Sequence, residues 1–401
     1  MKNIIGTDYI NQRDKELTKL FISSTKIKKY ILGINKLAKS VQKHVEVDGI
    51  IDDFTRIHTS RKKHILKIDE VDKNSIILST ATGSPLEVGA KLDEMGFTHF
   101  NYLSFYKYSS FDLADPPFIT DFKDDYKENK DKYKKTFDLL CDDKSKQTFE
   151  KVINFKISFD FDFMKGFTNN HEAQYFDKEI IPEIKNIRFV DGGAYIGDTL
   201  KEIIKNYPDY KKIYCIEPSD LHINIAKKNF VDEKNIEFIN CGLGNKKQLN
   251  QLEMQETQVN CDHNYQTNNI NTIDNLINEE VDYIKLDIEG AEQDTIEGAA
   301  KTIKKYKPIL AICIYHKAQD WYKIPQKSGF RHGTVNYTRT IDKVDDDDIH
   351  PSKVKFSKIV DKDFAKSTIH LEGLSHSSIN RDVFKTSCEV KVLKRLNHMP
   401  K

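Results

Sequence analysis

Three groups of glycines and acidic residues are the part of this sequence best equipped for chemistry. The first runs from Asp191 to Thr199 and reads DGGAYIGDT. The second is Glu217, about one βα unit later, and the third runs from Leu286 to Glu292 as LDIEGAE. Each follows an apolar run that reads as a buried strand. Because ligands of open α/β sheets bind outside the carboxyl ends of the strands, these groups predict a site for a nucleoside-bearing cofactor.

The glycine-rich turn favours S-adenosylmethionine (SAM) over NAD. Gly192, Gly193 and Gly197 allow a tight turn and a close approach of the backbone to a ligand. The helix that follows would offer unpaired N–H groups. An NAD site normally carries G-x-G-x-x-G here. Asp191 and Asp198 flank this turn instead, and their charge would repel a pyrophosphate but suit the ammonium and sulfonium groups of SAM.

Glu217 and Gly242 are predicted to complete the cofactor site. Glu217 ends the second strand of this region, where a carboxylate can accept hydrogen bonds from both ribose hydroxyls. NAD sites also bind the ribose through a carboxylate at this position, so Glu217 alone does not distinguish SAM from NAD. Gly242 lies in the turn after the third strand, where an adenine ring would lie, and an ordinary loop is an equally good interpretation.

The predicted reaction centre consists of Asp287, Glu289 and His316. Asp287 and Glu289 alternate at the end of the fourth strand, so both can face the same side. The alternative is that one of them caps the next helix. His316 follows the fifth strand, and its ordinary pKa of about 6.5 suits a general base; the alternative is a histidine that only bonds the backbone. These three residues could also bind a divalent metal, but a metal is not favoured and no metal site is predicted.

An alternation of strands and helices would position these residues. Five apolar runs read as strands: 187–190, 212–216, 236–241, 281–286 and 309–314. Helical segments lie between them, and the last of these is expected over 294–306. This order predicts a parallel α/β sheet. A similar, shorter rhythm over 26–106 predicts a smaller Rossmann-like domain, with 99–103 as its last strand. Its first turn has one glycine, Gly33, and Asp52 and Asp53 follow its second strand, but no ligand is predicted for it.

The predicted fold is therefore α/β, with a parallel sheet preceded by a smaller Rossmann-like domain and a helical connector. Five parts are expected along the chain. They are an N-terminal helix (1–25), the small Rossmann-like domain (26–106), a helical connector or lid (107–180), the SAM-binding domain (181–325) and a C-terminal extension without a predicted role (326–401).

The composition indicates a cytoplasmic protein without a nucleic-acid partner. The 401 residues carry 63 basic and 62 acidic side chains, a net charge of +1, so there is no global field favouring nucleic acid or a membrane surface. No apolar run approaches the about 20 residues that span a bilayer, and the N-terminus lacks the apolar run of a signal peptide. None of the six cysteines forms a C-x-x-C pair. We therefore expect reduced thiols. A homo-oligomer is compatible with the sequence.

These motifs resemble the FkbM-type SAM-dependent methyltransferases. The resemblance is carried by the glycine turn, Glu217-Pro218, Thr272-Ile273-Asp274, the 284–292 stretch and Tyr315-His316. It implies a class I SAM-methyltransferase fold, a Rossmann-like seven-stranded sheet with helices on both faces, and O-methylation of a sugar or polyketide hydroxyl. It also assigns Asp191, Gly193 and Gly197 to the SAM loop. The two antiparallel strands that usually end such proteins are matched only in part, by 331–334.

The sequence thus predicts an O-methyltransferase that acts on a sugar hydroxyl of a surface glycan or of its nucleotide-sugar precursor. Two alternatives stay open. One is a catalytically degenerate module that binds a nucleotide-sugar or a protein partner, and the other is an NAD(P)-dependent oxidoreductase. Binding of SAM or of a nicotinamide cofactor would discriminate between them.

Overall fold

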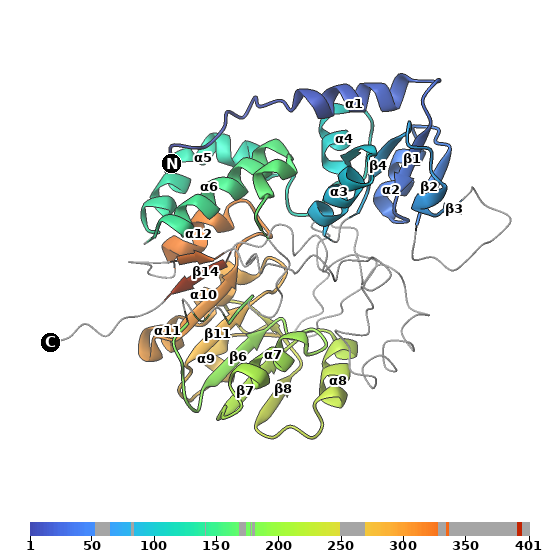
Figure 1. The fold of residues 1–401 in the computed structure, drawn as a ribbon. Helices are drawn as coiled ribbons and strands as arrows, with labels where there is room; N and C mark the ends of the chain where they lie inside the picture. Colours follow the sequence, from blue (N-terminus) through green and yellow to red (C-terminus); the bar gives the residue numbers. More distant parts are fainter. Residues whose placement is uncertain are drawn as a thin grey trace. The chain divides into compact units, whose positions relative to one another are not determined.

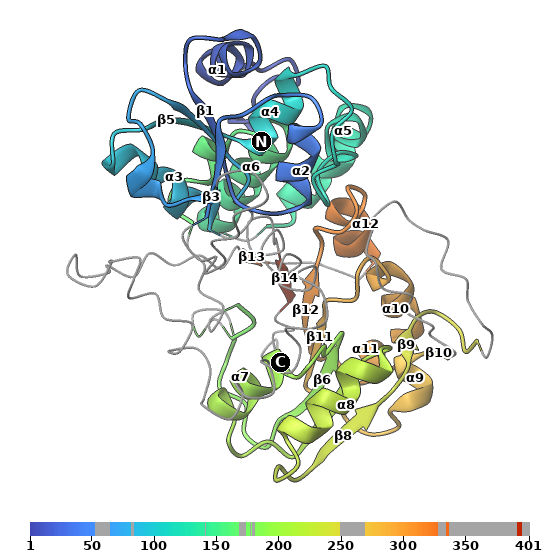
Figure 2. The same cartoon turned by 90° about the vertical axis from the view of Figure 1, so that its right-hand side faces the viewer.

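The computed structural model describes residues 1–52, 65–81, 84–140, 142–167, 174–176, 178, 181–248 and 269–327, with the backbone of 334–336 and 391–394. The chain forms two compact units. The described part of the first unit is Met1–Lys127 and Glu150–Lys165. The second unit contains Glu128–Phe149 and the described residues from Gly166 onward. Figures 1 and 2 show their elements.

The first unit contains a five-stranded parallel sheet, as the βαβ rhythm predicts. Its strand order is β3-β2-β1-β4-β5, and every neighbouring pair is parallel. Tyr30, Ile51 and Ile77 belong to its buried core. The strands are β1 (Lys29–Leu32), β2 (Gly49–Ile51), β3 (Ile65–Leu66), β4 (Ile76–Ser79) and β5 (Thr98–Asn101). The helices are α1 (Gln12–Ser23), α2 (Lys36–Gln42), α3 (Pro85–Glu94) and α4 (Tyr102–Tyr108).

The start of α4 corrects one prediction. Tyr102 and Leu103 are expected to continue a strand, but β5 ends at Asn101 and both residues are helical. The Asn101 side chain accepts a hydrogen bond from the Ser104 backbone N–H at 3.0 Å and so caps the helix. The aromatic residues of this segment favour a strand locally, and the cap overrides that preference.

The turn after β1, at Gly33, packs closely against Thr80. Gly33 has φ +108°, and a Cβ there would lie 2.8 Å from Thr80 Oγ1. The Asp52 carbonyl accepts a hydrogen bond from Lys67 Nζ at 3.0 Å. Asp53 lies outside the described residues.

Two long helices follow, as expected for the connector. They are α5 (Phe122–Asp138), which has a non-helical residue at Asn129, and α6 (Asp143–Ser158). The division between the two units falls inside both helices. The boundaries predicted for the five parts stay predictions.

The second unit is built on a seven-stranded sheet of order β13-β14-β12-β11-β6-β7-β8. Its first five strands in the chain are parallel, while β14 is antiparallel to β12 and β13. The chain runs outward from β6 to β8 and then returns to β11 on the other side of β6. The strands are β6 (Arg188–Gly192), β7 (Lys212–Ile216), β8 (Ile236–Ile239), β11 (Tyr283–Leu286), β12 (Ile309–Cys313), β13 (Thr334–Asn336) and β14 (Lys391–Lys394).

The last two strands come from beyond residue 325, a region for which the sequence suggests no role. Arg331 and His332, from the stretch 331–334 that matches the closing strands of the family in part, lie outside the described residues. The short strands β9 (Gly242–Leu243) and β10 (Ile270–Asn271) form a separate parallel pair.

The helices of this unit follow the strands in chain order (Figure 1). They are α7 (Asp198–Asn206), α8 (Asp220–Asn229), α9 (Ile273–Leu276), α10 (Glu292–Gly298), α11 (Ala300–Tyr306) and α12 (Asp320–Lys327). One continuous helix is expected over 294–306, but the structure has two. Their junction lies at Gly298, where a Cβ would be 2.0 Å from the carbonyl oxygen of Gly244. A bilayer-spanning helix is not found in the described part of the chain.

The cysteines that the structure describes are free thiols. Cys215, Cys241 and Cys313 are buried, as their apolar neighbours predict. The other three, Cys141, Cys261 and Cys388, lie outside the described residues.

Candidate functional site

The glycine turn and Asp287 meet at the point where the strand order reverses. Between β6 and β11 the connections leave in opposite directions, which is where open α/β sheets bind ligands. The Asp287 backbone N–H donates to the Gly192 carbonyl at 3.1 Å. Gly193 has φ +75°, and a Cβ there would lie 1.9 Å from the Asp287 carbonyl oxygen. Only glycine lets the two strand ends approach this closely.

A buried ion pair lies under this turn. Lys285 Nζ is 2.9 Å from Asp191 Oδ1, and both side chains are almost fully buried. The same ammonium donates to the carbonyls of Gly192 and Gly193, at 3.3 and 2.9 Å. Burial lowers the pKa of Lys285, but the nearby Asp191 charge more than offsets this and raises it. The Asp191 carboxylate therefore neutralises Lys285, and its role at the cofactor site stays a prediction.

Glu217 lies beside the turn, as its place at the end of β7 predicts. Its Oε2 accepts a hydrogen bond from the Tyr195 N–H and its Oε1 from the Ser219 N–H, both at 3.0 Å. Tyr195 has φ 48°, in the left-handed region. A carboxylate offers about four acceptor sites, so two backbone donors fix its orientation and leave capacity for a ligand.

The remaining predicted cofactor residues, Gly197, Asp198 and Gly242, lie at the start of a helix or a strand. Gly197, with φ 88°, is the N-cap of α7, and Asp198 opens that helix with an exposed side chain. Gly242 begins β9, and its N–H donates to the Asn269 carbonyl at 2.9 Å. A small hollow next to Asp198 is lined by Gln174, Tyr175 and Phe176.

The three predicted catalytic residues lie together. His316 Nε2 is 3.5 Å from Asp287 Oδ1 and 3.7 Å from Glu289 Oε2. The Asp287 carboxylate also accepts hydrogen bonds from the Tyr315 hydroxyl at 3.0 Å and the Tyr175 hydroxyl at 3.4 Å. The capping alternative is not supported, because the N-cap of α10 is Ala291. Glu289 has φ 56°, and strained residues of this kind often lie at active sites.

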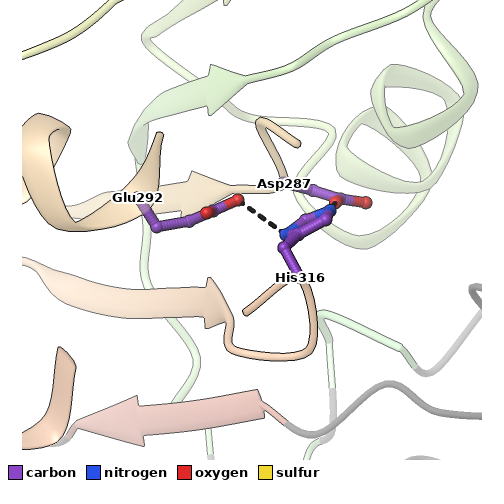
Figure 3. Close-up of side chains that lie close together, drawn as sticks. All are labelled: Asp287, Glu292 and His316. Carbon is purple, nitrogen blue, oxygen red and sulfur yellow. Dashed lines mark ion pairs between the residues drawn. The ribbon is translucent and has the colours of Figure 1, made fainter. Parts of the chain in front are cut away.

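Glu292 joins this group from the first residue of α10. Its Oε1 is 3.0 Å from His316 Nδ1, so the imidazole lies between Glu292 and Asp287 (Figure 3). Burial lowers the pKa of His316, but the charges of Glu292, Glu289 and Asp287 act more strongly and raise it to about 9. The imidazole is thus mostly protonated at neutral pH, unlike the base with a pKa of about 6.5 that the sequence suggests.

Sequence reasoning missed two members of the site, Glu292 and Lys285. An acidic residue at the start of a helix is ordinary, so Glu292 gives no clear signal. Lys285 does give one: it is the single charged residue in the apolar run YIKL of a central strand. A fully buried lysine requires a partner, and the acidic residue at the end of the neighbouring strand is the nearest candidate.

Comparisons with known proteins agree with this geometry. Residues 191–342 match the family model of the methyltransferase FkbM domain. The crystal structure of methyltransferase FkbM from Methylobacillus flagellatus is similar, with 21% identity, a TM-score of 0.63, and coverage of 82% of this chain and 90% of that chain. A SAM-dependent methyltransferase from Aquifex aeolicus matches at 15% identity over 42% of this chain and 85% of that chain, with a TM-score of 0.25. No curated protein matches significantly.

The family model covers the glycine turn, the reaction centre and β13, and the first of these structures shares the fold. The predicted class I methyltransferase architecture, Rossmann-like with a seven-stranded sheet, is confirmed. Residues 191–342 are therefore similar to the methyltransferase FkbM domain, and the chain shares the fold of a methyltransferase FkbM.

Proposed function

We propose that this chain is a SAM-dependent O-methyltransferase that acts in the cytoplasm on a sugar hydroxyl of a surface glycan or of its nucleotide-sugar precursor. One observation carries the cofactor assignment. The Glu217 carboxylate is fixed by two backbone N–H groups beside a turn that only glycine can form. This arrangement suits a ribose with two free hydroxyls.

The residues around the turn fit S-adenosylmethionine. Glu217 would accept the ribose hydroxyls, and Gly193 leaves room for the ligand to approach the backbone. Because Lys285 neutralises Asp191, attraction for the cationic groups depends on Asp198, Asp287 and Glu289. When bound, SAM supplies a methyl group whose bond to sulfur breaks as a bond to the acceptor oxygen forms.

The chain's own residues would hold the acceptor and remove its proton. Carboxylates and tyrosine hydroxyls bind sugar hydroxyls well, and Asp287 lies beside Tyr175 and Tyr315. Since His316 is already protonated near neutral pH, a carboxylate is the better base. Glu289 is the most accessible candidate, because its side chain is 44% exposed whereas that of Asp287 is 12% exposed. General-base assistance of this kind is worth about 10²–10⁴-fold in rate.

The cofactor assignment is tested by replacing Glu217 with alanine. Glu217→Ala should weaken SAM binding at least about tenfold, because hydrogen bonds to a charged group contribute about 1.5–3 kcal/mol each. Isothermal titration calorimetry with SAM measures this, and labelled SAM with nucleotide-sugars or isolated surface glycan measures turnover.

Glu237→Ala is the matched control. Glu237 lies on β8 of the same sheet, with a half-exposed side chain that pairs with Lys212. It should bind SAM like the natural protein. If the natural protein shows no heat with millimolar SAM, the methyltransferase proposal is wrong.

A further inference from the structure

Asp287, Glu292 and His316 form a compact group of potential metal ligands. Each offers one nitrogen or oxygen atom, and these three atoms lie within 4.8 Å of one another. Asp287 follows β11, Glu292 opens α10 and His316 follows β12, so three separate elements bring them together. Figure 3 shows both carboxylates directed at the imidazole.

The charges of this group do not balance without a further cation. The side chain of Glu292 is fully buried, that of His316 is 1% exposed and that of Asp287 is 12% exposed. Two carboxylates contribute −2, and a protonated imidazole contributes at most +1. A buried ion costs several kcal/mol of desolvation, and a bound cation of opposite charge would offset part of that cost.

The nearby ammonium groups contact other atoms. Lys285 Nζ pairs with Asp191, and Lys317 Nζ donates to the carbonyl of Gly290 at 2.5 Å. Asp320 is also fully buried close by, where it accepts hydrogen bonds from the Lys317 N–H and from Gln293. The charge of Lys285 is balanced by Asp191 and that of Lys317 by Asp320, so these residues add no net positive charge to the group.

Glu292 provides a second, independent observation. Its Oε1 accepts a hydrogen bond from the Ile288 N–H at 2.9 Å and faces His316. Its Oε2 is buried and has no hydrogen-bond donor among the described residues. A buried acceptor in this state costs about 1–3 kcal/mol, and more when it is charged. A cation bound beside the carboxylate would satisfy this oxygen.

We propose that Asp287, Glu292 and His316 bind one divalent transition-metal ion, of the Mn²⁺ or Zn²⁺ type. With a neutral imidazole, two carboxylates and the ion, the net charge of the group is zero. Carboxylates suit Mn²⁺ and imidazole suits Zn²⁺, so this mixed set favours either ion over Ca²⁺. Three protein ligands leave a coordination position open for a water molecule or a hydroxyl.

The ion would orient the acceptor hydroxyl and lower its pKa, which makes proton transfer to Glu289 easier. This role rests on the proposed methyl transfer, whereas binding of the ion does not. The two claims can therefore be tested separately on the full-length protein.

The test is a titration of chelator-treated, dialysed protein with Mn²⁺. Electron paramagnetic resonance measures the free ion, and Zn²⁺ is added as a competitor. We expect one Mn²⁺ per chain, displaced by Zn²⁺. Glu292→Gln should weaken binding at least about tenfold, since even outer partners of metal ligands contribute 10–100-fold. Glu297→Gln makes the same chemical change at an exposed position of α10 and should leave the affinity unchanged.

Bound Mn²⁺ should also show the magnetic coupling of an imidazole nitrogen, and His316→Ala should remove it. This readout does not depend on the folding of Glu292→Gln. Absence of bound Mn²⁺ and Zn²⁺ in the natural protein would overturn the proposal, as would unchanged affinity in a folded Glu292→Gln variant.

Calorimetry with SAM on the metal-free protein separates the two proposals. SAM binding without metal binding leaves the methyltransferase and removes the metal site. Metal binding without SAM binding supports the metal site and contradicts the methyltransferase proposal.

Discussion

At the scale of single residues, the pair of Asp191 and Lys285 allows the clearest prediction of stability. Lys285→Met keeps a long apolar stem but removes the ammonium, which leaves the Asp191 carboxylate buried without its partner. Removing one member of a buried ion pair costs about 3–5 kcal/mol. Urea unfolding followed by the fluorescence of Trp321, the single tryptophan, should show this loss.

The double variant Asp191→Asn/Lys285→Met is the informative comparison, because it removes the stranded charge as well. It should recover part of the stability that Lys285→Met loses. Lys301→Met, at an exposed position of α11, should stay within about 0.5 kcal/mol of the natural protein. Equal losses in the single and double variants would contradict the pairing.

The residue types of the candidate site could largely be predicted from the sequence, but their protonation could not. Asp287, Glu289 and His316 follow two adjacent strands, so their proximity follows from strand order alone. The raised pKa of His316 depends on Glu292, which reaches it from the helix after the turn. To predict this contact, one must know the path of the chain between Asp287 and α10. The spacing of apolar and polar residues in the sequence does not specify that path.

At the scale of elements, the contact between the ends of β6 and β11 depends on Gly193. In Gly193→Ala the new methyl would collide with the Asp287 carbonyl, so the two strand ends must separate. Overpacking of this kind costs about 1–3 kcal/mol, in addition to about 1–2 kcal/mol for the left-handed backbone. Urea unfolding measures this loss, and calorimetry should show that SAM binding is lost.

Gly96→Ala isolates the backbone contribution to that loss. Gly96 has the same φ of +75°, but a Cβ there would meet nothing within 4 Å. This variant should lose only the left-handed penalty and keep SAM binding. If Gly193→Ala binds SAM normally, the close approach of the two strands is not needed for the cofactor site.

Helices and strands could be predicted from the sequence where the local pattern of apolar residues agrees with their packing in the folded protein. The parallel strands that follow apolar runs are confirmed in both sheets, whereas the two-residue strand β3 is not predicted. The single helix expected over 294–306 is wrong because Gly298 packs against Gly244, a contact between residues distant in the chain. Strands β13 and β14 are short, and in the described part of the chain β14 pairs with β12 and β13, which are distant from it in sequence, so this pairing gives no local signal.

At the scale of the whole molecule, the single tryptophan lets one unit be observed by itself. Trp321 is fully buried in the second unit, where its ring packs edge-on against Phe149 at 5.2 Å. SAM at 100 times its dissociation constant should stabilise the fluorescence-detected transition by about 2.7 kcal/mol. Circular dichroism, which reports helices of both units, gives the comparison.

Glu217→Ala should abolish this stabilisation at the same SAM concentration. A shift in the dichroism transition without a shift in the fluorescence transition would place the ligand outside the second unit. That outcome would contradict the assignment of the cofactor to the glycine turn.

The position of β14 has a consequence for synthesis of the protein on the ribosome. β14 lies between β12 and β13 in the sheet but follows both in the chain. Among the described strands, β14 is the neighbour of both β12 and β13 on this side of the sheet, so neither pairing can form until residues 391–394 emerge. Exposed strand edges pair readily with other chains. The nascent chain therefore depends on rapid completion of its C-terminal region, or on a chaperone, to avoid aggregation.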